Sequence, residues 1–303
     1  MKTVFVVNNK NNRLAKVLPT LKTFCEHIDG VQFVATQRKQ QAIELARQAT
    51  ENGCDYLIAV GGDGTLHEII NGMMQAEVSV NAYPTIGLLP NGSANDFART
   101  AGVSNSIVEL FELIHSNTIQ TIDIGKILLH QNKEIRYFIN VAGVGLGPEV
   151  VQNLEQSSSF FGPSFNYFRH IIQGFLSYQK KEVTCTGNTW QWKGKLLQMA
   201  VGNGRYFGNA ICVAPDAKIN DGQFQIAVFG DLSIWDYLKN MRNLKKGVKI
   251  NHPQVSYHDA DEIMIESNDV CGIEADGEFV GLAPATISVL PKAICFLLPS
   301  DVQ

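Results

Sequence analysis

The sequence predicts an α/β domain followed by a mainly antiparallel β domain. Strand-like and helical patterns alternate up to residue 121, whereas strand-like patterns dominate from residue 122 onward. In addition, a glycine-rich turn stands between a strand and a helix of the first part. We therefore expect domains at residues 1–121 and 122–290, with residues 291–303 packing back on the first domain.

Four short apolar runs in the first domain have the length and composition of buried strands. Helical patterns with apolar residues at three-to-four spacing separate them, and Ser104 is the predicted N-cap of the last helix. This alternation favours a parallel sheet covered by helices. The predicted strands are residues 3–7, 31–35, 56–60 and 85–89.

The second domain contains strand-like runs with few helices between them, which favours an antiparallel arrangement. Helices are predicted at residues 164–178 and 234–244, and residues 294–298 have the pattern of a short buried strand. The predicted strands are residues 122–129, 137–141, 196–202, 223–229, 262–265 and 287–289.

Composition excludes several classes of protein. The chain has 303 residues, of which 45% are hydrophobic, enough for one large or two ordinary domains. A net charge of −4 without a long basic run does not indicate nucleic-acid binding. The six cysteines are scattered without a C-x-x-C pair, which favours a reducing cytoplasm. No apolar run approaches the roughly 20 residues that span a bilayer, so we expect any membrane contact to be peripheral.

The segment Gly61-Gly62-Asp63-Gly64-Thr65, the glycine turn below, indicates phosphate chemistry. Glycines let the backbone approach a phosphate, and a helix N-terminus presents free N–H groups and a positive dipole end. The carboxylate of Asp63 would repel a bare phosphate, so it suits either a Mg²⁺ ion or a proton from an attacking hydroxyl. The pattern predicts phosphoryl transfer. The bland alternative is a structural turn with an N-capping side chain.

Two further polar segments are candidates. Ser93, Asn95 and Asp96 follow a predicted strand, and ligands of open parallel sheets bind at the carboxyl ends of strands, although simple helix capping explains these residue types equally well. Residues 274–278 place three acidic groups in five positions, which favours a metal or a catalytic role over a plain hairpin. No Walker-type loop is present.

On these motifs the chain resembles the diacylglycerol kinase catalytic-domain family, which includes bacterial soluble lipid kinases and sphingosine, ceramide and diacylglycerol kinases. The resemblance runs nearly end to end and is closest to the bacterial enzymes. In order, the matching segments are residues 61–65, 92–99, 140–145, 201–208, 215–222 and 276–278.

The resemblance implies a phosphofructokinase-like α/β domain, a C-terminal β-sandwich and an active site in the cleft between them. It implies ATP-dependent phosphorylation of a lipid hydroxyl, with ATP and Mg²⁺ as cofactors, at a membrane surface. It implies a Mg²⁺ held by the carboxylate of Asp221 and the main-chain carbonyls of Lys218 and Gln223. The base is expected in the family's Asp-Gly-Glu segment, at Asp276 or Glu278.

Nucleotide contacts are expected on three groups of residues. In the first loop the family's usual Asn-Pro-x-Ser/Ala-Gly is replaced by Asn8-Asn9-Lys10-Asn11-Asn12, in which asparagine tolerates the turn and Lys10 adds a phosphate contact. The predicted nucleotide-site residues are Asn8, Lys10, Asn12, Thr36, Gly61, Gly62, Asp63, Gly64, Thr65, Leu66, His67, Glu68, Ser93, Asn95 and Asp96.

The sequence therefore predicts a cytoplasmic, peripheral lipid kinase with Asp63, Asp276 and Glu278 as catalytic candidates. A phenylalanine-rich stretch, residues 160–175, either lines an acyl channel or forms an ordinary core helix. Two other functions stay open: a nicotinamide-dinucleotide kinase, and a degenerate kinase that binds nucleotide or lipid without turnover. The identity of the lipid and the oligomeric state, including a homodimer, are not set by the sequence.

Overall fold

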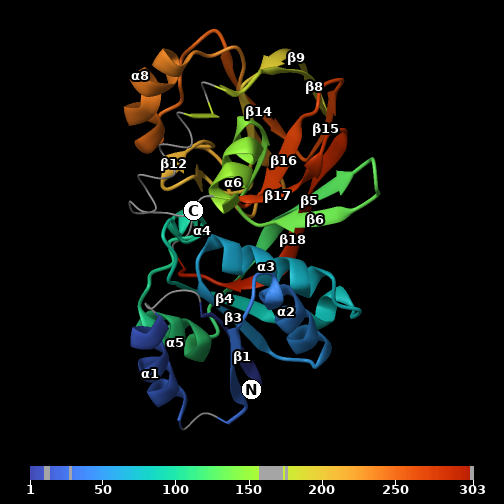
Figure 1. The fold of residues 1–303 in the computed structure, drawn as a ribbon. Coiled ribbons are helices and arrows are strands. Elements are labelled where there is room, and N and C mark those ends of the chain that lie inside the picture. The colour runs from blue at the N-terminus through green and yellow to red at the C-terminus, as the bar shows by residue number, and fades with distance from the viewer. Residues whose placement is uncertain (10–13, 27–28, 157–172, 175–176, 301–303) are drawn as a thin grey trace. The chain divides into compact units, whose positions relative to one another are not determined.

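A computed structural model gives the fold and describes residues 1–9, 14–26, 29–156, 173–174 and 177–300. The chain divides into two compact units (Figure 1). Unit 1 comprises Met1–Ile122 and Lys292–Gln303, and unit 2 comprises Asp123–Pro291. The strands β5 and β18 contribute residues to both units.

Unit 1 contains a parallel sheet in the order β2-β1-β3-β4, and the end of β18 pairs with β4 at Phe296. Its apolar runs form strands because both faces of the sheet are buried. Each of the four parallel strands β1 to β4 runs one residue beyond its predicted end. The strands are β1 (Thr3–Asn8), β2 (Val31–Thr36), β3 (Tyr56–Gly61), β4 (Thr85–Pro90) and β18 (Ala285–Leu297).

Helices of unit 1 follow the strands in alternation, as the sequence predicts. Gly72 lets two of them approach closely, because a Cβ there would lie 2.2 Å from the Ile43 carbonyl oxygen. Phe5, Ile58 and Leu110 belong to the core between the sheet and these helices. The helices are α1 (Leu14–Cys25), α2 (Gln41–Glu51), α3 (Asp63–Met74), the 3₁₀ turn η1 (Val80–Ala82), α4 (Asp96–Thr100) and α5 (Ile107–Ser116).

The N-cap of α5 is Ser106 rather than the predicted Ser104. The Ser106 hydroxyl accepts a hydrogen bond from Glu109 N at 3.3 Å. Ser104 instead donates to the Glu109 carboxylate. The reason is spacing, since only Ser106 stands three residues before a glutamate, as in a capping box.

Unit 2 is a β-sandwich. One sheet has the order β14-β13-β10-β7-β16-β17, and the other contains β18-β15-β8-β9 with β5 and β6. Side chains such as Phe138, Phe224 and Ile265 belong to one buried apolar core. The strands are β5 (Ile119–Leu129), β6 (Ile135–Phe138), β7 (Val141–Gly145), β8 (Lys181–Gly187), β9 (Gln191–Leu196), β10 (Gln198–Gly202), β11 (Tyr206–Phe207), β12 (Ile211–Cys212), β13 (Phe224–Phe229), β14 (Val255–Ala260), β15 (Glu262–Ser267), β16 (Gly272–Ala275) and β17 (Glu278–Leu282).

Several predicted elements of unit 2 differ from the structure. The predicted strand 137–141 is broken between β6 and β7, and 196–202 is divided between β9 and β10. The tail 294–298 is not a separate strand but mostly the end of β18. A helix α6 (Leu146–Gln156) was not predicted, and α8 (Ile234–Lys245) matches its predicted range closely. Most of the predicted helix 164–178 lies outside the described residues.

Glu274 is a carboxyl group inside the sandwich. It is 0% exposed on β16, and its Oε2 accepts a hydrogen bond from Gly277 N at 2.8 Å. Its Oε1 has no partner among the described residues and faces Gly143, where a Cβ would lie 2.2 Å away. Burial raises the pKa of Glu274 well above its usual value, and the charges of Asp276 and Glu278 add to the rise.

This environment predicts a specific pH dependence of stability. In the unfolded chain Glu274 ionises near its usual pKa of 4.5, whereas in the fold it stays neutral to higher pH. The free energy of unfolding therefore falls as pH rises between the two pKa values. We expect Glu274→Gln to remove this part of the fall, as measured by urea unfolding between about pH 5 and about pH 9.

The matched control is Glu266→Gln, which removes an exposed carboxylate on β15. Its pH profile is expected to parallel that of the wild type. A Glu274→Gln profile that also runs parallel to the wild type would show that this carboxyl group does not titrate differently on folding.

Candidate active site

The carboxyl ends of the parallel strands of unit 1 lie side by side. Register pairs Asn8 at the end of β1 with Thr36 at the end of β2, and Gly61 of β3 with Pro90 of β4. Asn91 N, just past β4, donates to the Gly61 carbonyl at 2.7 Å. Ligands of open parallel sheets bind at this edge. The fold therefore brings the predicted first loop, glycine turn and second loop to one edge of the sheet.

The glycine turn leads directly into α3, with Gly62 as the N-cap residue. As a glycine, Gly62 provides no side-chain cap for this helix end. Thr65 Oγ1 accepts a hydrogen bond from Asn8 Nδ2 at 2.9 Å, which fixes the turn against the end of β1. A Cβ at Gly61 would lie 2.4 Å from Thr65 Oγ1, so the turn requires glycine there. The N-terminus of a twelve-residue helix at this edge suits an anion.

Two glycine backbones meet at the edge. A Cβ added to Gly62 would lie 2.8 Å from the Gly92 Cα, and one added to Gly92 would lie 2.4 Å from the Gly62 Cα. Asn95, in a left-handed conformation at φ 51°, accepts from Gly92 N at 2.9 Å and donates to Gly92 O at 3.1 Å. Asn95 thus shapes the second loop, and the exposed Ser93 lies within it.

Asp63 joins the two turns. Its Oδ1 accepts a hydrogen bond from Phe97 N at 3.0 Å, in the first turn of α4. The carboxylate is half-buried, whereas the neighbouring Asp96 is buried. Asp63 therefore has a structural role in addition to any ligand that its remaining lone pairs hold.

The rest of the predicted nucleotide stretch has mixed surroundings. Leu66 is part of the apolar core, and His67 is buried with its Nε2 3.3 Å from Asn71 Nδ2. Glu68 caps the neighbouring helix α2, since its two carboxylate oxygens accept from Gln40 N at 3.2 Å and Ala42 N at 3.1 Å.

At the end of β2 Thr36 is buried, and its hydroxyl accepts a hydrogen bond from Asn9 N of the first loop at 3.4 Å. Lys10 and Asn12 lie outside the described residues. Partly exposed residues at this edge include Asn8, Gly62, Asp63, Gly64, Asn91, Gly92 and Asn95, and Ser93 is exposed.

In unit 2 the Asp276-Gly277 pair forms the turn between β16 and β17, with φ of 50° and 87°. The Asp276 carboxylate is 7% exposed and accepts three backbone hydrogen bonds, from Ile139 N at 3.0 Å, Asn140 N at 2.9 Å and Val141 N at 3.1 Å. These bonds explain the break between β6 and β7, because the N–H groups there serve a carboxylate. Glu278 is half-buried at the start of β17.

Sequence reasoning missed a buried polar cluster next to this turn. Asn203 is fully buried, and its Nδ2 donates to Ile139 O at 2.7 Å and Asp123 O at 3.1 Å. Asn140 O accepts from both Asn203 N and Gly204 N. The side-chain oxygens of Asn140 and Asn203 have no partner among the described residues. An asparagine within each of two glycine-containing motifs was the available signal.

Asp123 was also missed, although an aspartate between Ile122 and Ile124 in a strand is itself a signal. It is fully buried, and its Oδ2 accepts from Gly222 N at 2.7 Å. Its backbone N donates to Ile219 O at 2.7 Å. Asp123 therefore fixes the loop that carries the predicted magnesium ligands.

The predicted magnesium loop has suitable donors. The exposed Asp221 accepts a hydrogen bond from Gln223 N at 3.1 Å through Oδ1. Carboxylate and carbonyl oxygens are the ligands that Mg²⁺ prefers. Within the described residues no cluster of three or more His, Cys, Asp or Glu side chains has metal-binding geometry. Because two of the expected ligands are carbonyls, the site on Lys218, Asp221 and Gln223 stays a prediction.

An apolar cavity of ≈ 110 Å³ lies within unit 2, beneath α8. A single water needs roughly 10–15 Å³ by this measure, so the volume of the cavity is large enough for several waters. Gln198 on β10 and Asp236, Tyr237 and Asn240 on α8 are its polar lining. The apolar lining comes from α6, the β-strands and α8, and includes Leu146, Val150, Ala200, Phe229, Leu244 and Ile250.

Comparisons with known proteins match both units. The diacylglycerol kinase catalytic domain matches residues 2–127, and the YegS C-terminal NAD kinase beta sandwich-like domain matches residues 141–298. A diacylglycerol kinase of Staphylococcus aureus (strain Newman) is 31% identical over 274 residues, covering 88% of this chain and 82% of that protein. A diacylglycerol kinase of Staphylococcus carnosus (strain TM300) is 28% identical over 270 residues, covering 89% of this chain and 85% of that protein.

Solved structures agree on the fold. A diacylglycerol kinase from Bacillus anthracis str. Sterne superposes with a TM-score of 0.72 at 21% identity, over 100% of this chain and 98% of that chain. A second solved chain from the same organism gives a TM-score of 0.77 at 23% identity, with the same coverage. The chain therefore belongs to the diacylglycerol kinase family of lipid kinases.

Proposed function

We propose that this protein is an ATP-dependent kinase that transfers the γ-phosphoryl group to the hydroxyl of a lipid, such as a diacylglycerol or a related glycerolipid or sphingoid. The observation that carries the proposal is the glycine turn, which leads a helix N-terminus to the carboxyl edge of the parallel sheet. The family membership supports the lipid acceptor.

The chain's own groups account for phosphate binding. The N–H groups at the start of α3 would face a bound phosphate, and Gly62 and Gly92 would keep side chains out of the contact. A bound Mg²⁺ would neutralise charge on the phosphates. Asp63 is the proposed holder of this ion, and the Lys218–Asp221–Gln223 loop is the proposed holder of a separate, structural Mg²⁺, since both offer carboxylate oxygen.

The base is proposed to come from the turn that Asp276 and Glu278 flank. The lipid O–H bond breaks as its oxygen bonds to phosphorus, the proton passes to a carboxylate, and ADP leaves. The structure gives the two carboxylates different surroundings, because Asp276 accepts three backbone N–H groups while Glu278 is more exposed. In either case Asp276 also positions the segment 139–141.

The apolar cavity in unit 2 is proposed to receive an acyl chain. Its lining is almost wholly apolar, and Gln198, Asp236 and Asn240 provide polar groups suited to a lipid headgroup or its linkage. Most of the stretch 160–175, the acyl site that the sequence suggests, lies outside the described residues. We therefore propose the cavity as the acyl site.

Among the described residues, none of the helices combines the length and apolar character needed to cross a membrane. All six cysteines are free thiols. We propose that the protein meets its lipid acceptor at a membrane surface from the cytoplasm.

The decisive test is ATP consumption by the purified full chain with a panel of acceptors. We expect turnover with at least one lipid alcohol and none with a dinucleotide. Turnover with NAD would favour the second candidate, a nicotinamide-dinucleotide kinase, for which the NAD kinase-like description of the C-terminal domain is the specific reason. Nucleotide binding by calorimetry without turnover on any acceptor would favour the degenerate kinase.

Substitutions of the two carboxylates of the Asp276-Gly277-Glu278 turn should differ in their effect on the stability of the protein. Asp276→Asn removes an acceptor of three backbone hydrogen bonds and should lower both the melting temperature and the rate. Glu278→Gln should leave the melting temperature within a few degrees. The residue that acts as base should lose about 10² to 10⁴ in rate while ATP still binds. Full activity in both variants with a verified lipid would exclude this turn as the proton acceptor.

Magnesium dependence should change at the loop that Asp123 fixes. Asp221→Ala removes the one ionic donor of the proposed set, so we expect a higher Mg²⁺ concentration for half-maximal activity and a lower melting temperature in Mg²⁺ but not in EDTA. Asp261→Ala, which removes an exposed carboxylate elsewhere in unit 2, is the control. Identical Mg²⁺ titrations for Asp221→Ala and wild type would place the ion elsewhere.

Filling the cavity should discriminate between acceptors by chain length. Val213 is half-buried in the lining of the cavity, so the substitution Val213→Trp should fill part of the cavity. We expect kcat/KM to fall by about tenfold or more for long-chain acceptors and less for short-chain ones, because only long chains need the filled space. Val270→Trp, at an exposed position outside the lining, is the control. Equal losses for short and long chains would show that the cavity is not the acyl site.

A further inference from the structure

The helix α8 has two chemically different faces. Its inner face carries Asp236, Tyr237, Asn240 and Leu244, all of which line the cavity of unit 2. At 3.6 residues per turn, positions 235, 238, 242 and 245 lie on the opposite side. That outer face is available because folding does not use it.

The outer face combines exposed apolar side chains with cations. Trp235 is 75% exposed and Leu238 is 37% exposed, and Val248, just beyond the helix, is 50% exposed. An exposed tryptophan of this extent has no role in the core of unit 2. The exposed cations of the same face and of the residues after it are Lys239, Arg242, Lys245, Lys246 and Lys249.

Charge on this surface is opposite to that of the whole chain. From residue 237 to residue 250 the sequence has five cations and no acidic residue, whereas the chain as a whole has a net charge of −4. Of these cations, Lys249 forms an ion pair with Asp216 and lies over the ring of Tyr257. The positive charge is therefore concentrated at α8 and the residues that follow it.

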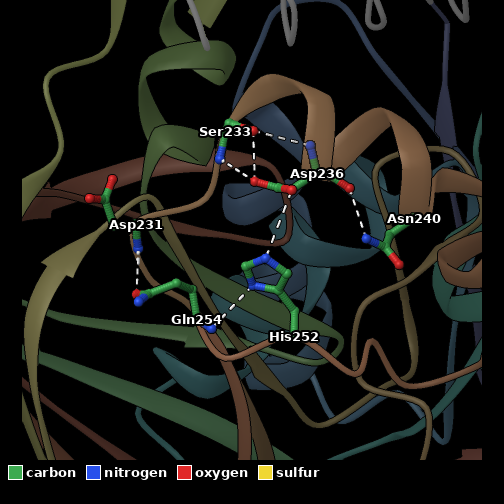
Figure 2. Close-up of polar contacts among 6 residues, drawn as sticks. All are labelled: Asp231, Ser233, Asp236, Asn240, His252 and Gln254. Carbon is green, nitrogen blue, oxygen red and sulfur yellow. Dashed lines mark hydrogen bonds and ion pairs between the residues drawn. The ribbon is translucent and has the colours of Figure 1, made fainter.

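The start of α8 is held firmly, so its outer face is presented in a fixed direction. Ser233 and Asp236 form a capping box, with Ser233 Oγ accepting from Asp236 N at 3.2 Å and Asp236 Oδ2 accepting from Ser233 N at 3.0 Å. His252 Nε2 lies 3.8 Å from Asp236 Oδ1, and Asn240 donates to Asp236 O at 2.9 Å (Figure 2). The Ser233 hydroxyl, which also donates to Asp236 Oδ2 at 2.6 Å, and the Ser233 N–H hold the pKa of Asp236 below its usual value.

We propose that the outer face of α8, with Trp235, Leu238, Lys239, Arg242 and Lys245, docks on the surface of an anionic lipid bilayer. Tryptophan prefers the membrane–water interface, and Lys and Arg side chains extend their charges to the headgroups while their stems cover apolar surface. Because this face is positively charged, it favours a membrane with anionic headgroups over a membrane with neutral ones. The inference builds on the proposed lipid acceptor, because the opposite face of the same helix lines the proposed acyl cavity.

The test measures vesicle binding by the full chain without ATP or a lipid acceptor. Vesicles of phosphatidylcholine alone are compared with vesicles that contain about 30% phosphatidylglycerol, at low and high salt. We expect binding to the anionic vesicles only, weakened by salt. The emission of Trp235 should shift to the blue on binding, since Trp190 and Trp192 already pack against the sandwich core.

Variants locate the surface. Lys239→Gln/Arg242→Gln/Lys245→Gln should weaken binding on the order of 100-fold, at about fivefold per cation. Trp235→Ala should weaken it roughly tenfold and abolish the fluorescence shift. The matched controls are Lys22→Gln/Lys193→Gln/Lys195→Gln, which removes three exposed cations elsewhere, and Val270→Ala, at a side chain that is 73% exposed. Both controls should bind as the wild type does.

Three results would overturn the proposal: wild-type protein that ignores anionic vesicles, α8 variants that bind them as the wild type does, or controls that lose binding equally. Sedimentation velocity tests for a second copy as occupant, and a dimer that Trp235→Ala dissociates in the absence of vesicle binding would also overturn it. Thermal melts of each variant check folding.

Kinase assays keep the two proposals apart. Activity of the α8 variants on a soluble short-chain acceptor should equal that of the wild type. Vesicle binding without any kinase activity would refute the proposed function and leave the docking surface standing. Kinase activity combined with vesicle binding that the α8 variants do not weaken would support the proposed function and refute the docking surface.

Discussion

The architecture of unit 1 depends on one close approach between two backbones. Gly62 and Gly92 meet at the carboxyl ends of β3 and β4, where a Cβ on either would lie within 3 Å of the other's Cα. Because neither residue has a side chain, the N-terminus of α3 and the second loop can share one edge. Asp63 then secures the arrangement by accepting from Phe97 N. The proposed phosphate site at this edge would thus be a consequence of packing as much as of local sequence.

Unit 2 is organised by buried carboxylates rather than by apolar contacts alone. Asp123 and Asp276 accept backbone N–H groups from segments far away in the sequence. Glu274 accepts from Gly277 and stabilises the turn that presents Asp276 and Glu278. Burying a charge is costly unless it is hydrogen-bonded, so each partner matters for the fold. The candidate base and the candidate magnesium loop are therefore held by the same kind of interaction, a carboxylate that accepts backbone hydrogen bonds.

Local pattern was sufficient where the structure depends on local physics. The four parallel strands of unit 1 are continuous apolar runs, and the comparisons confirm the family that short motifs predicted. Prediction failed where a distant residue decides. The strand expected at 137–141 is broken because Asp276, far along the chain, takes its N–H groups. No window of sequence around this strand contains that partner.

The two faces of α8 have different roles. The inner face packs in the fold, whereas the outer face has a composition that packing does not explain. Leu244 and Tyr237 face the interior, so substitutions there change packing. Trp235 and Leu238 contribute nothing to that interior, yet they are apolar and exposed beside a row of cations. Stability alone would permit polar residues at both positions. A surface for anionic lipid explains the residues that the fold leaves unexplained, and it places that surface on the helix whose other side closes the cavity.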